Sequence, residues 1–296
     1  MKGRNMKIQV NAFAKINLML DILRTMDNGF HELFMLMQSV SLCDSVTVEP
    51  NESGKISVLC SNGAIPTGES NIAFKAAKEF FEKTKIKNNG VSIYIEKNIP
   101  HAAGLAGGSA DAAGTVVALK ELFCPTLSDR ELVEICANVG SDVPFCALGG
   151  TMLAQYTGTV LSYLPSLKLG KIIIVKPEMS VSTGEAYKAF DSAERIRHLD
   201  KAGILDAVMT GNTAGIYSRV DNVFEQFIDV PERILIKAAM RKHGAACCCM
   251  SGSGPSVFGI FEDEKSAESC FEELQKSFRQ VFLCDAVKSG TEILKG

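Results

Sequence analysis

The stretch from Pro100 to Ala113 constrains the fold of this chain more than any other, because it joins a strand-like segment to a helix-like one. Before it, Val91, Ile93 and Ile95 alternate with polar residues, as in a half-buried strand. After it, the alanine-rich segment 111–123 has apolar residues at helical spacing. The glycines of this stretch are therefore predicted to lie where a strand ends and a helix starts.

A glycine-rich helix start is suited to bind a phosphate group. The first amide N–H groups of a helix lack partners within it, and the helix dipole places its positive end there. Glycine lets an anion approach those groups closely. The order Gly104, Gly107, Gly108, Ser109 matches neither a Walker loop nor the dinucleotide-binding fingerprint. A tight strand-to-helix turn without a ligand is the alternative interpretation.

The composition is that of a globular protein with a large core, since 46% of the 296 residues are hydrophobic. This length suits one large domain or two of ordinary size. The 31 basic and 34 acidic residues give a net charge of -3, without a long block of like charges. We therefore expect neither a nucleic-acid arm nor a polybasic membrane patch. No apolar run reaches the roughly 18 residues that a membrane span needs.

Ten cysteines raise the question of a disulfide scaffold. The segment Met1–Met6 leads into no apolar signal-peptide core, so we expect a cytoplasmic protein with reduced thiols. No Cys-x-x-Cys pair occurs. The run Cys247–Cys249 is interpreted as the core of a strand, because an extended backbone cannot direct three neighbouring side chains at one tetrahedral metal. A metal cluster is the weaker alternative.

The segment Lys7–Leu23 alternates as one or two strands. Lys15 and Asn17 are predicted to point to the same side of it. A solvated polar face is the ordinary interpretation of such residues. The small neighbours Ala12 and Ala14 favour instead a lysine directed into a cleft.

Phe30 and His31 follow the predicted turn Asp27–Gly29. A histidine beside an aromatic residue has a structural role as often as a ligand contact. An imidazole and an aromatic ring together also suit a planar heterocycle that forms hydrogen bonds.

Asp142 precedes Val143–Pro144, a pattern typical of a short helix start, so its simplest role is that of an N-cap. The functional alternative is a carboxylate fixed at a helix start, placed to act as a base or as the partner of a cation.

The rest of the chain predicts a mixed α+β second half, with a domain boundary near residue 163. The capping patterns predict helices at 71–83 and 128–138. Strands 44–49 and 55–59 are expected to pair across a turn at 51–54. After the boundary we expect strands 171–175, 246–250, 256–261 and 280–286, helices 231–242 and 264–278, and a second glycine loop at 251–255.

Five segments resemble the motifs of the GHMP kinases, a family of small-molecule kinases. They occur along the chain in the order of those motifs, and the resemblance covers nearly the whole chain. They are the nucleotide loop Pro100–Ala110, the third motif Met250–Pro255, and the segments Ala14–Leu18, Gly29–His31 and Gly140–Pro144. The resemblance is strongest to the branch whose alcohol acceptor carries cytidine diphosphate.

The resemblance implies an α+β fold of two domains. Residues 1–163 would form a nucleotide-binding and catalytic domain like ribosomal protein S5 domain 2, and residues 164–296 a ferredoxin-like α+β domain. The implied reaction is ATP-dependent phosphorylation of a small-molecule hydroxyl, with ATP and Mg²⁺ as cofactors and no nucleic-acid or membrane partner. A monomer or weak homodimer is implied. A GHMP kinase with a non-cytidine acceptor is the alternative. A non-catalytic binding module is the weaker one, because it would not need both Lys15 and Asp142.

Residue by residue, the resemblance gives Lys15 and Asp142 catalytic roles. It assigns ATP binding to Pro100, His101, Ala102, Ala103, Gly104, Leu105, Ala106, Gly107, Gly108, Ser109 and Ala110. It assigns substrate binding to Asn17, Phe30, His31 and Tyr187, and a third glycine motif to Ser251, Gly252, Ser253 and Gly254. Two residues depart from the pattern: Phe30 stands where Tyr is usual, and Ala110 where a second Ser is usual. These departures remove a phenol contact and a candidate hydroxyl contact to phosphate or Mg²⁺.

Overall fold

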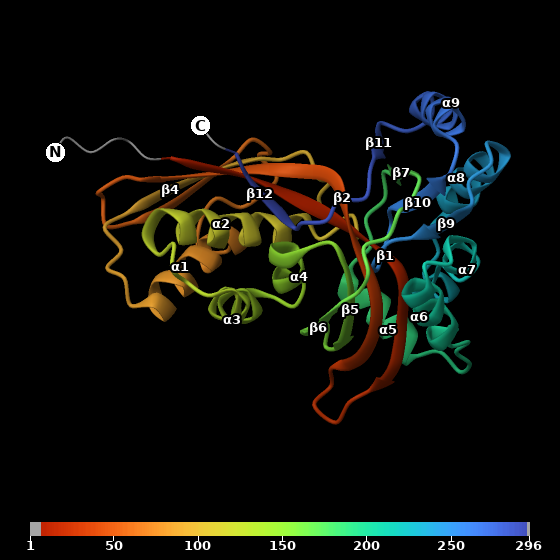
Figure 1. The fold of residues 1–296 in the computed structure, drawn as a ribbon, viewed down its shortest axis with the longest axis horizontal. Helices are drawn as coiled ribbons and strands as arrows, with labels where there is room; N and C mark the ends of the chain where they lie inside the picture. Colours follow the sequence, from red (N-terminus) through yellow and green to blue (C-terminus); the bar gives the residue numbers. More distant parts are fainter. Residues whose placement is uncertain (1–6, 295–296) are drawn as a thin grey trace.

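A computed structural model describes residues 7–294, which form two β-sheets flanked by helices (Figure 1). The first sheet has eight strands. Its main path runs β12-β1-β2-β4-β3, β5 continues from β2 to β6, and β8 pairs with β1. The strands are β1 (Ile8–Thr25), β2 (His31–Pro50), β3 (Ile56–Cys60), β4 (Val91–Glu96), β5 (Thr151–Tyr156), β6 (Val160–Tyr163), β8 (Asp221–Asn222) and β12 (Thr291–Leu294).

The antiparallel pair β1 and β2 is the longest feature of this sheet, and its hairpin end projects past β5 to the bottom of the view in Figure 1. It confirms the predicted strand at 7–23. The pairing has three register irregularities, one of them between Asn17 and Met19. The polar side of β1 is not solvated, because Lys15, Asn17 and Asp21 are all buried. The expectation of a cleft-directed lysine therefore fits better than that of a wet strand face.

Four helices cover one face of the first sheet: α1 (Ile72–Thr84), α2 (Gly107–Phe123), α3 (Asp129–Val139) and α4 (Val143–Leu148) (Figure 1). The predicted helix starts are confirmed. The Asn71 side chain accepts a hydrogen bond from the backbone N–H of Ala73, and Ser128 and Glu131 form a reciprocal capping box. Helix α2 starts at Gly107, inside the glycine stretch, so its first amides belong to the predicted phosphate loop.

The predicted pairing of strands 44–49 and 55–59 is wrong. Strand β4 lies between β2 and β3, antiparallel to β2 and parallel to β3. Val46 of β2 faces Ile95, and Val58 of β3 faces Ile93. A turn sequence shows that the chain reverses but not which strand fills the neighbouring place, and β4 brings three buried apolar residues to that place.

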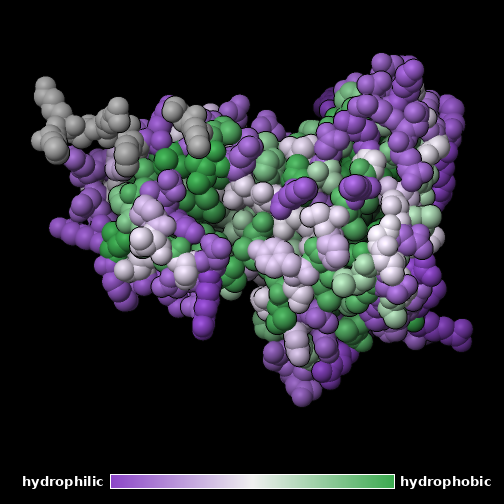
Figure 2. All heavy atoms as spheres, in the orientation of Figure 1, coloured by the Kyte–Doolittle hydropathy of each residue, from purple (hydrophilic) through white to green (hydrophobic). Residues whose placement is uncertain are grey.

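The second sheet is a four-stranded antiparallel sheet of order β11-β7-β10-β9, formed by β7 (Lys171–Lys176), β9 (Cys247–Met250), β10 (Val257–Phe261) and β11 (Gln280–Cys284). Helices α8 (Pro231–Lys242) and α9 (Glu264–Gln275) pack on one face, and Figure 2 shows a hydrophilic outer surface over α9. Chain order and strand order together are those of a ferredoxin-like unit, so the expected α+β class is confirmed.

The connection between β7 and β9 also contains α5 (Thr183–Asp191), α6 (Lys201–Thr210), α7 (Thr213–Tyr217) and the 3₁₀ turn η1 (Val223–Gln226). The predicted strand at 246–250 is confirmed as β9, in which Cys249 is buried. Strands β8 and β12 return to the first sheet, and the domain division at residue 163 stays a prediction.

No helix within residues 7–294 is both long and apolar enough to cross a membrane. The segment Met1–Met6, on which the expectation of a cytoplasmic protein was based, lies outside the described residues.

Candidate active site

A cavity of about 1010 Å³ lies where β1, the starts of α2, α4 and α5, and the second glycine loop meet. It brings together most of the residues singled out from the sequence. Among these, its lining includes Lys15, Phe30, His31, Pro100, His101, Ala102, Ala103, Gly104, Ala106, Gly107, Gly108, Ser109, Asp142, Tyr187, Gly252, Ser253 and Gly254. Leu105, Ala110, Ser251 and Asn17 lie behind this surface and are buried or nearly so.

The start of α2 offers the cavity a set of backbone donors. Its N-cap residue, Ala106, has φ +59° and makes no side-chain hydrogen bond to the first turn. Ala102 has φ +49°, so the loop contains two non-glycine residues in the left-handed region. Such conformations persist where the surrounding structure requires them, and they are concentrated at ligand sites. The open amides of the first turn are therefore available to an anion.

The two glycine loops pack directly against each other. The Ser251 hydroxyl donates to the Gly104 carbonyl at 2.9 Å. Gly104 has φ +72°, and a β-carbon there would lie 2.1 Å from the Ser251 carbonyl oxygen. A β-carbon at Gly252 would lie 2.9 Å from the Gly104 carbonyl oxygen. Glycine at these positions is required for the loops to approach each other.

Gly104→Ala is expected to destabilise the protein by about 1 to 3 kcal/mol, because alanine is strained at this φ and its methyl group collides with a backbone carbonyl. Gly108→Ala is the matched control, since its β-carbon would meet only the Ile72 side chain at 3.6 Å. Denaturant unfolding of both variants tests this. Equal behaviour of the two variants would show that the contact between the loops is unimportant.

Lys15 is nearly buried, with 4% of its surface exposed. Its ammonium group donates to the Asn17 side-chain oxygen at 2.6 Å and to the Gly104 carbonyl at 3.1 Å. Within residues 7–294, no carboxylate oxygen forms an ion pair with it. The charge of Lys15 is thus held in place by neutral oxygens and is available to an anionic ligand.

Asn17 does not line the cavity, although the resemblance implies that it contacts the substrate. It is fully buried, and its side-chain oxygen accepts hydrogen bonds from the Lys15 ammonium and from the Gly252 backbone N–H at 3.0 Å. In this structure Asn17 therefore links Lys15 to the second glycine loop. The strand alternation correctly predicted that Asn17 and Lys15 point to the same side of β1. It could not show that the second glycine loop covers Asn17 on that side.

Asp142 lines the same cavity as Lys15. It stands at the N-cap position of α4, yet its side chain makes no capping hydrogen bond, so the simpler interpretation is not supported. Burial raises the pKa of the Cys146 thiol; the charge of Asp142 raises it too, whereas that of Lys15 lowers it. Burial, and then the charge of Asp142, raises the pKa of Tyr187 to about 12. Asp142 therefore lies close enough to Tyr187 and to the Cys146 thiol to raise the pKa of each, and the charge of Lys15 acts on the same thiol.

An aromatic group forms another part of the lining. The rings of His31 and Tyr187 stack with centroids 4.5 Å apart, and Phe224 meets Tyr187 edge-on at 5.2 Å. His31 Nε2 lies 2.8 Å from an oxygen of Asp191, and this hydrogen bond lowers the pKa of the Asp191 carboxyl. Phe30 is 61% exposed and carries no such partner ring among the described residues. These side chains suit a planar, polar ligand.

A buried charge cluster beneath the glycine loop was not predicted. The Lys97 ammonium donates to Asp44 and, at 2.8 Å, to Asp111. Asp44 also accepts from the backbone N–H groups of Asn98 and Ile99 at 2.6 and 2.8 Å, which lead into the loop. Burial raises the pKa of the Asp111 carboxyl, outweighing the lowering effect of Lys97. Lys97 and Asp111 line the cavity, so the cluster supports the predicted phosphate site from below.

Two family models match this chain: the N-terminal domain of GHMP kinases at residues 71–150, and the C-terminal domain of GHMP kinases at residues 233–280. The first match contains the glycine loop, α2 and Asp142, which the structure brings to one cavity. The second overlaps the ferredoxin-like unit and its glycine loop.

Full-length relatives give the same result. The chain is 39% identical over 290 residues to the 4-diphosphocytidyl-2-C-methyl-D-erythritol kinase of Alkaliphilus oremlandii, covering 97% of this chain and 99% of the relative. It belongs to the GHMP kinase family. The enzyme of that name from Acetivibrio thermocellus is 41% identical over 282 residues, covering 95% of this chain and 99% of the relative.

Solved structures agree on the fold of this GHMP kinase. A crystal structure of 4-(cytidine 5'-diphospho)-2C-methyl-D-erythritol kinase superposes with a TM-score of 0.78 at 30% identity, covering 97% of this chain and all of that one. A homoserine kinase from Cytophaga hutchinsonii superposes with a TM-score of 0.79 at 20% identity, covering 99% of each chain. The second likeness concerns the fold alone. The chain is thus an ATP-dependent small-molecule kinase.

Proposed function

We propose that this enzyme transfers the γ-phosphoryl group of ATP to the 2-hydroxyl of 4-diphosphocytidyl-2-C-methyl-D-erythritol, giving the 2-phosphate and ADP. This reaction belongs to the non-mevalonate route to isoprenoid precursors. The observation that carries the proposal is one cavity that unites the open start of α2, the Lys15 and Asp142 pair, and the aromatic group at His31. The relatives of that name support it, because they match this chain almost from end to end.

Phosphoryl transfer asks a protein mainly for alignment and for positive charge around the moving group. In the proposed reaction, backbone N–H groups at the start of α2 hold the ATP phosphates and the Lys15 ammonium faces the transferred group. The acceptor oxygen forms the new bond to phosphorus while the bond to the leaving ADP oxygen breaks. Asp142 receives the hydroxyl proton or orients that hydroxyl.

The residues present also fit a Mg²⁺ ion that would arrive with ATP. Among the described residues, Asp111 Oδ1 is buried without a hydrogen-bond partner, and Ser109, two residues earlier in the first turn of α2, is part of the cavity lining. Mg²⁺ is usually held by one or two protein oxygens together with substrate phosphates and water. Asp111 and Ser109 would hold it here, where it would neutralise charge on the phosphates. Ala110 is buried and supplies no hydroxyl for this purpose.

A GHMP kinase with a non-cytidine acceptor is the second candidate, because the fold alone is shared with homoserine kinases. Two features favour the cytidine-linked acceptor. One is the stack of His31 on Tyr187 beside the exposed ring of Phe30. The other is the higher sequence identity with a relative named 4-diphosphocytidyl-2-C-methyl-D-erythritol kinase, 39% against 20% with the homoserine kinase. A coupled assay of ADP release with each acceptor distinguishes the two.

A cytoplasmic location and a monomeric or weakly dimeric state stay predictions from the sequence.

His31→Ala and Phe30→Ala are each expected to weaken binding of the cytidine-linked acceptor by about 1 to 3 kcal/mol, while ATP binding changes little. Loss of His31 removes a polar partner and one ring of the stack, and loss of Phe30 removes an aromatic face. Phe30→Tyr should be mild because the ring remains. Isothermal titration with acceptor and with ATP measures both effects.

Tyr163→Ala is the matched control for these titrations. Tyr163 is an aromatic residue at the end of β6, 69% exposed and outside the cavity lining of the described residues. Its loss should leave both ligands unaffected. Unchanged acceptor binding in both alanine variants of the site would contradict the cytidine pocket and favour the other kinase.

A further inference from the structure

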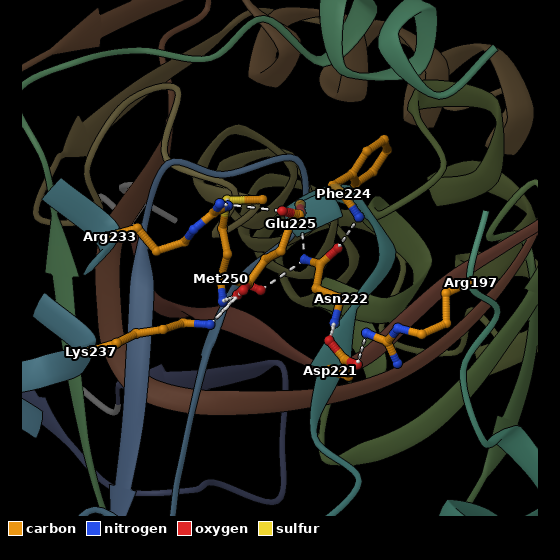
Figure 3. A network of polar contacts seen from close by, with 9 residues as sticks. Arg197, Asp221, Asn222, Phe224, Glu225, Arg233, Lys237 and Met250 are labelled. Atoms are coloured by element: carbon orange, nitrogen blue, oxygen red, sulfur yellow. Dashed lines mark hydrogen bonds and ion pairs between the residues drawn. The ribbon is translucent and has the colours of Figure 1, made fainter. Parts of the chain in front are cut away.

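Asn222 lies fully buried in β8 and uses its whole side-chain amide in hydrogen bonds (Figure 3). Its Nδ2 donates to the carbonyl oxygens of Met250 and Gly252, each at 2.8 Å. Its Oδ1 accepts from the backbone N–H of Phe224 at 3.0 Å. One side chain thus joins the second glycine loop to η1.

The same loop is held from a second point on η1. Glu225 accepts a hydrogen bond from the Met250 backbone N–H at 2.6 Å and one from the Lys237 ammonium at 2.7 Å (Figure 3). Arg233 in turn donates to the Glu225 carbonyl at 3.2 Å. The end of β9 is therefore fixed, and Asn222 extends this network beyond β9 to the Gly252 carbonyl of the loop.

The peptide groups of Gly252 connect Asn222 to Lys15. The Gly252 carbonyl accepts from Asn222, while its N–H donates to Asn17 at 3.0 Å. The same oxygen of Asn17 accepts the Lys15 ammonium at 2.6 Å. Gly252 has φ +57° and packs against the Gly104 backbone. A shift of Gly252 would therefore displace Asn17, which is the only side-chain hydrogen-bond partner of Lys15 in the described chain.

We propose that Asn222 is a positioning residue for phosphoryl transfer, which places the Lys15 ammonium by fixing Gly252. Asn222 is not among the cavity-lining residues of the described chain, so it acts through its neighbours and not on the substrate. The inference rests on the role of Lys15 in the proposed function. A displacement of about 1 Å at a reacting group can cost about a hundredfold in rate, so a small movement of the loop is sufficient.

The competing explanation is that Asn222 acts only as the cap of η1 and thereby places Phe224. Phe224 lines the cavity and packs on Tyr187, so that route would affect acceptor binding. Two variants separate the routes. Asn222→Asp keeps an oxygen for the Phe224 N–H but replaces the donor to both carbonyls by a repelling oxygen. Asn222→Ala removes both interactions.

Both variants are expected to lower kcat at least about tenfold, with Michaelis constants for ATP and acceptor within about threefold of wild type. Asn212→Ala is the matched control, because Asn212 caps α7 through the Gly215 N–H, outside the cavity lining of the described residues. Its kcat should be unchanged. Normal kcat in Asn222→Asp, or a loss that falls on the acceptor Michaelis constant alone, would overturn the proposal.

A double-mutant cycle with Lys15→Met identifies the residue through which Asn222 acts. Asn222→Asp should reduce the residual rate of Lys15→Met by less than about twofold, because the group that it positions is already absent. An undiminished loss in that background would overturn the inference while leaving the proposed function intact. Near-normal turnover of Lys15→Met alone would contradict both.

Hydrogen exchange of the Gly252 amide gives a readout that is independent of activity. This exchange should be faster in Asn222→Asp than in wild type, and unchanged exchange would also overturn the proposal.

Discussion

Asp142→Asn and Lys15→Met are each expected to lower turnover by at least about a hundredfold while the protein still folds. This is the usual scale for losing a positioned acid–base group or a charge that stabilises the transition state. Asparagine keeps the size of Asp142 but cannot accept the hydroxyl proton. Methionine keeps much of the length of Lys15 but presents no charge to the transferred group. Steady-state kinetics at saturating substrates, with thermal unfolding of each variant, measure both effects.

The structure gives each substitution a low structural cost. The Asp142 side chain makes no capping hydrogen bond to α4, so asparagine breaks no hydrogen bond at the helix start. Lys15 forms hydrogen bonds with Asn17 and Gly104 and no ion pair within residues 7–294, so its loss leaves no carboxylate unpaired. A change in rate without a change in unfolding temperature is therefore the expected pattern.

Asp129→Asn is the control for Asp142, because Asp129 also stands at a helix start, in the first turn of α3. Its side chain is 87% exposed and forms an ion pair with Lys120 at 3.3 Å. Turnover of this variant should be normal. Wild-type turnover in Asp142→Asn would mean that the carboxylate has no part in proton transfer, whatever its place in the cavity.

The features that the sequence predicted are those whose signal is local. The cap of α1 joins Asn71 to Ala73, and the capping box of α3 joins Ser128 to Glu131, so each lies within one turn of helix. The alternation of β1 likewise placed Lys15 and Asn17 on one side. In each case the residues that decide the structure are neighbours in the chain.

The features that it did not predict depend on partners far apart in the chain. The Asn17 side chain meets a backbone N–H 235 residues away, and Lys97 meets an aspartate 53 residues away. Spacing carries no information about such pairs. The sequence shows Lys97 three residues before Pro100 and Asp111 in an alanine-rich segment. Either residue is as typical of a solvated surface as of a buried ion pair. The family resemblance supplied the long-range order that the pattern lacked.

Lys97→Met is expected to lower the free energy of unfolding by about 3 to 5 kcal/mol, the range for removing one partner of a buried ion pair. Lys97 lies between Asp44 and Asp111, and the side chains of all three are almost completely buried. Without the ammonium, two buried carboxylates lose their cation. Denaturant unfolding of wild type and variant measures the difference.

The loss should depend on pH in a defined direction. In wild type, burial already raises the pKa of Asp111 and Lys97 opposes this, so removing Lys97 raises that pKa further. A folded-state pKa above the unfolded value gives stability that is present at low pH and lost as the pH rises through the folded-state pKa. The deficit of Lys97→Met relative to wild type should thus be larger at about pH 8 than at about pH 5.5.

Lys120→Met is the control for this prediction, because its ion pair with Asp129 is at the surface and should contribute at most about 1 kcal/mol. A similarly small loss in Lys97→Met would show that the two buried aspartates are stabilised without the cation. A loss of the expected size that is independent of pH would point to lost packing of the lysine stem instead. Because Asp44 also holds the backbone at Asn98 and Ile99, the ATP Michaelis constant should rise with the loss of stability. The buried cluster would then support both the fold and the nucleotide loop.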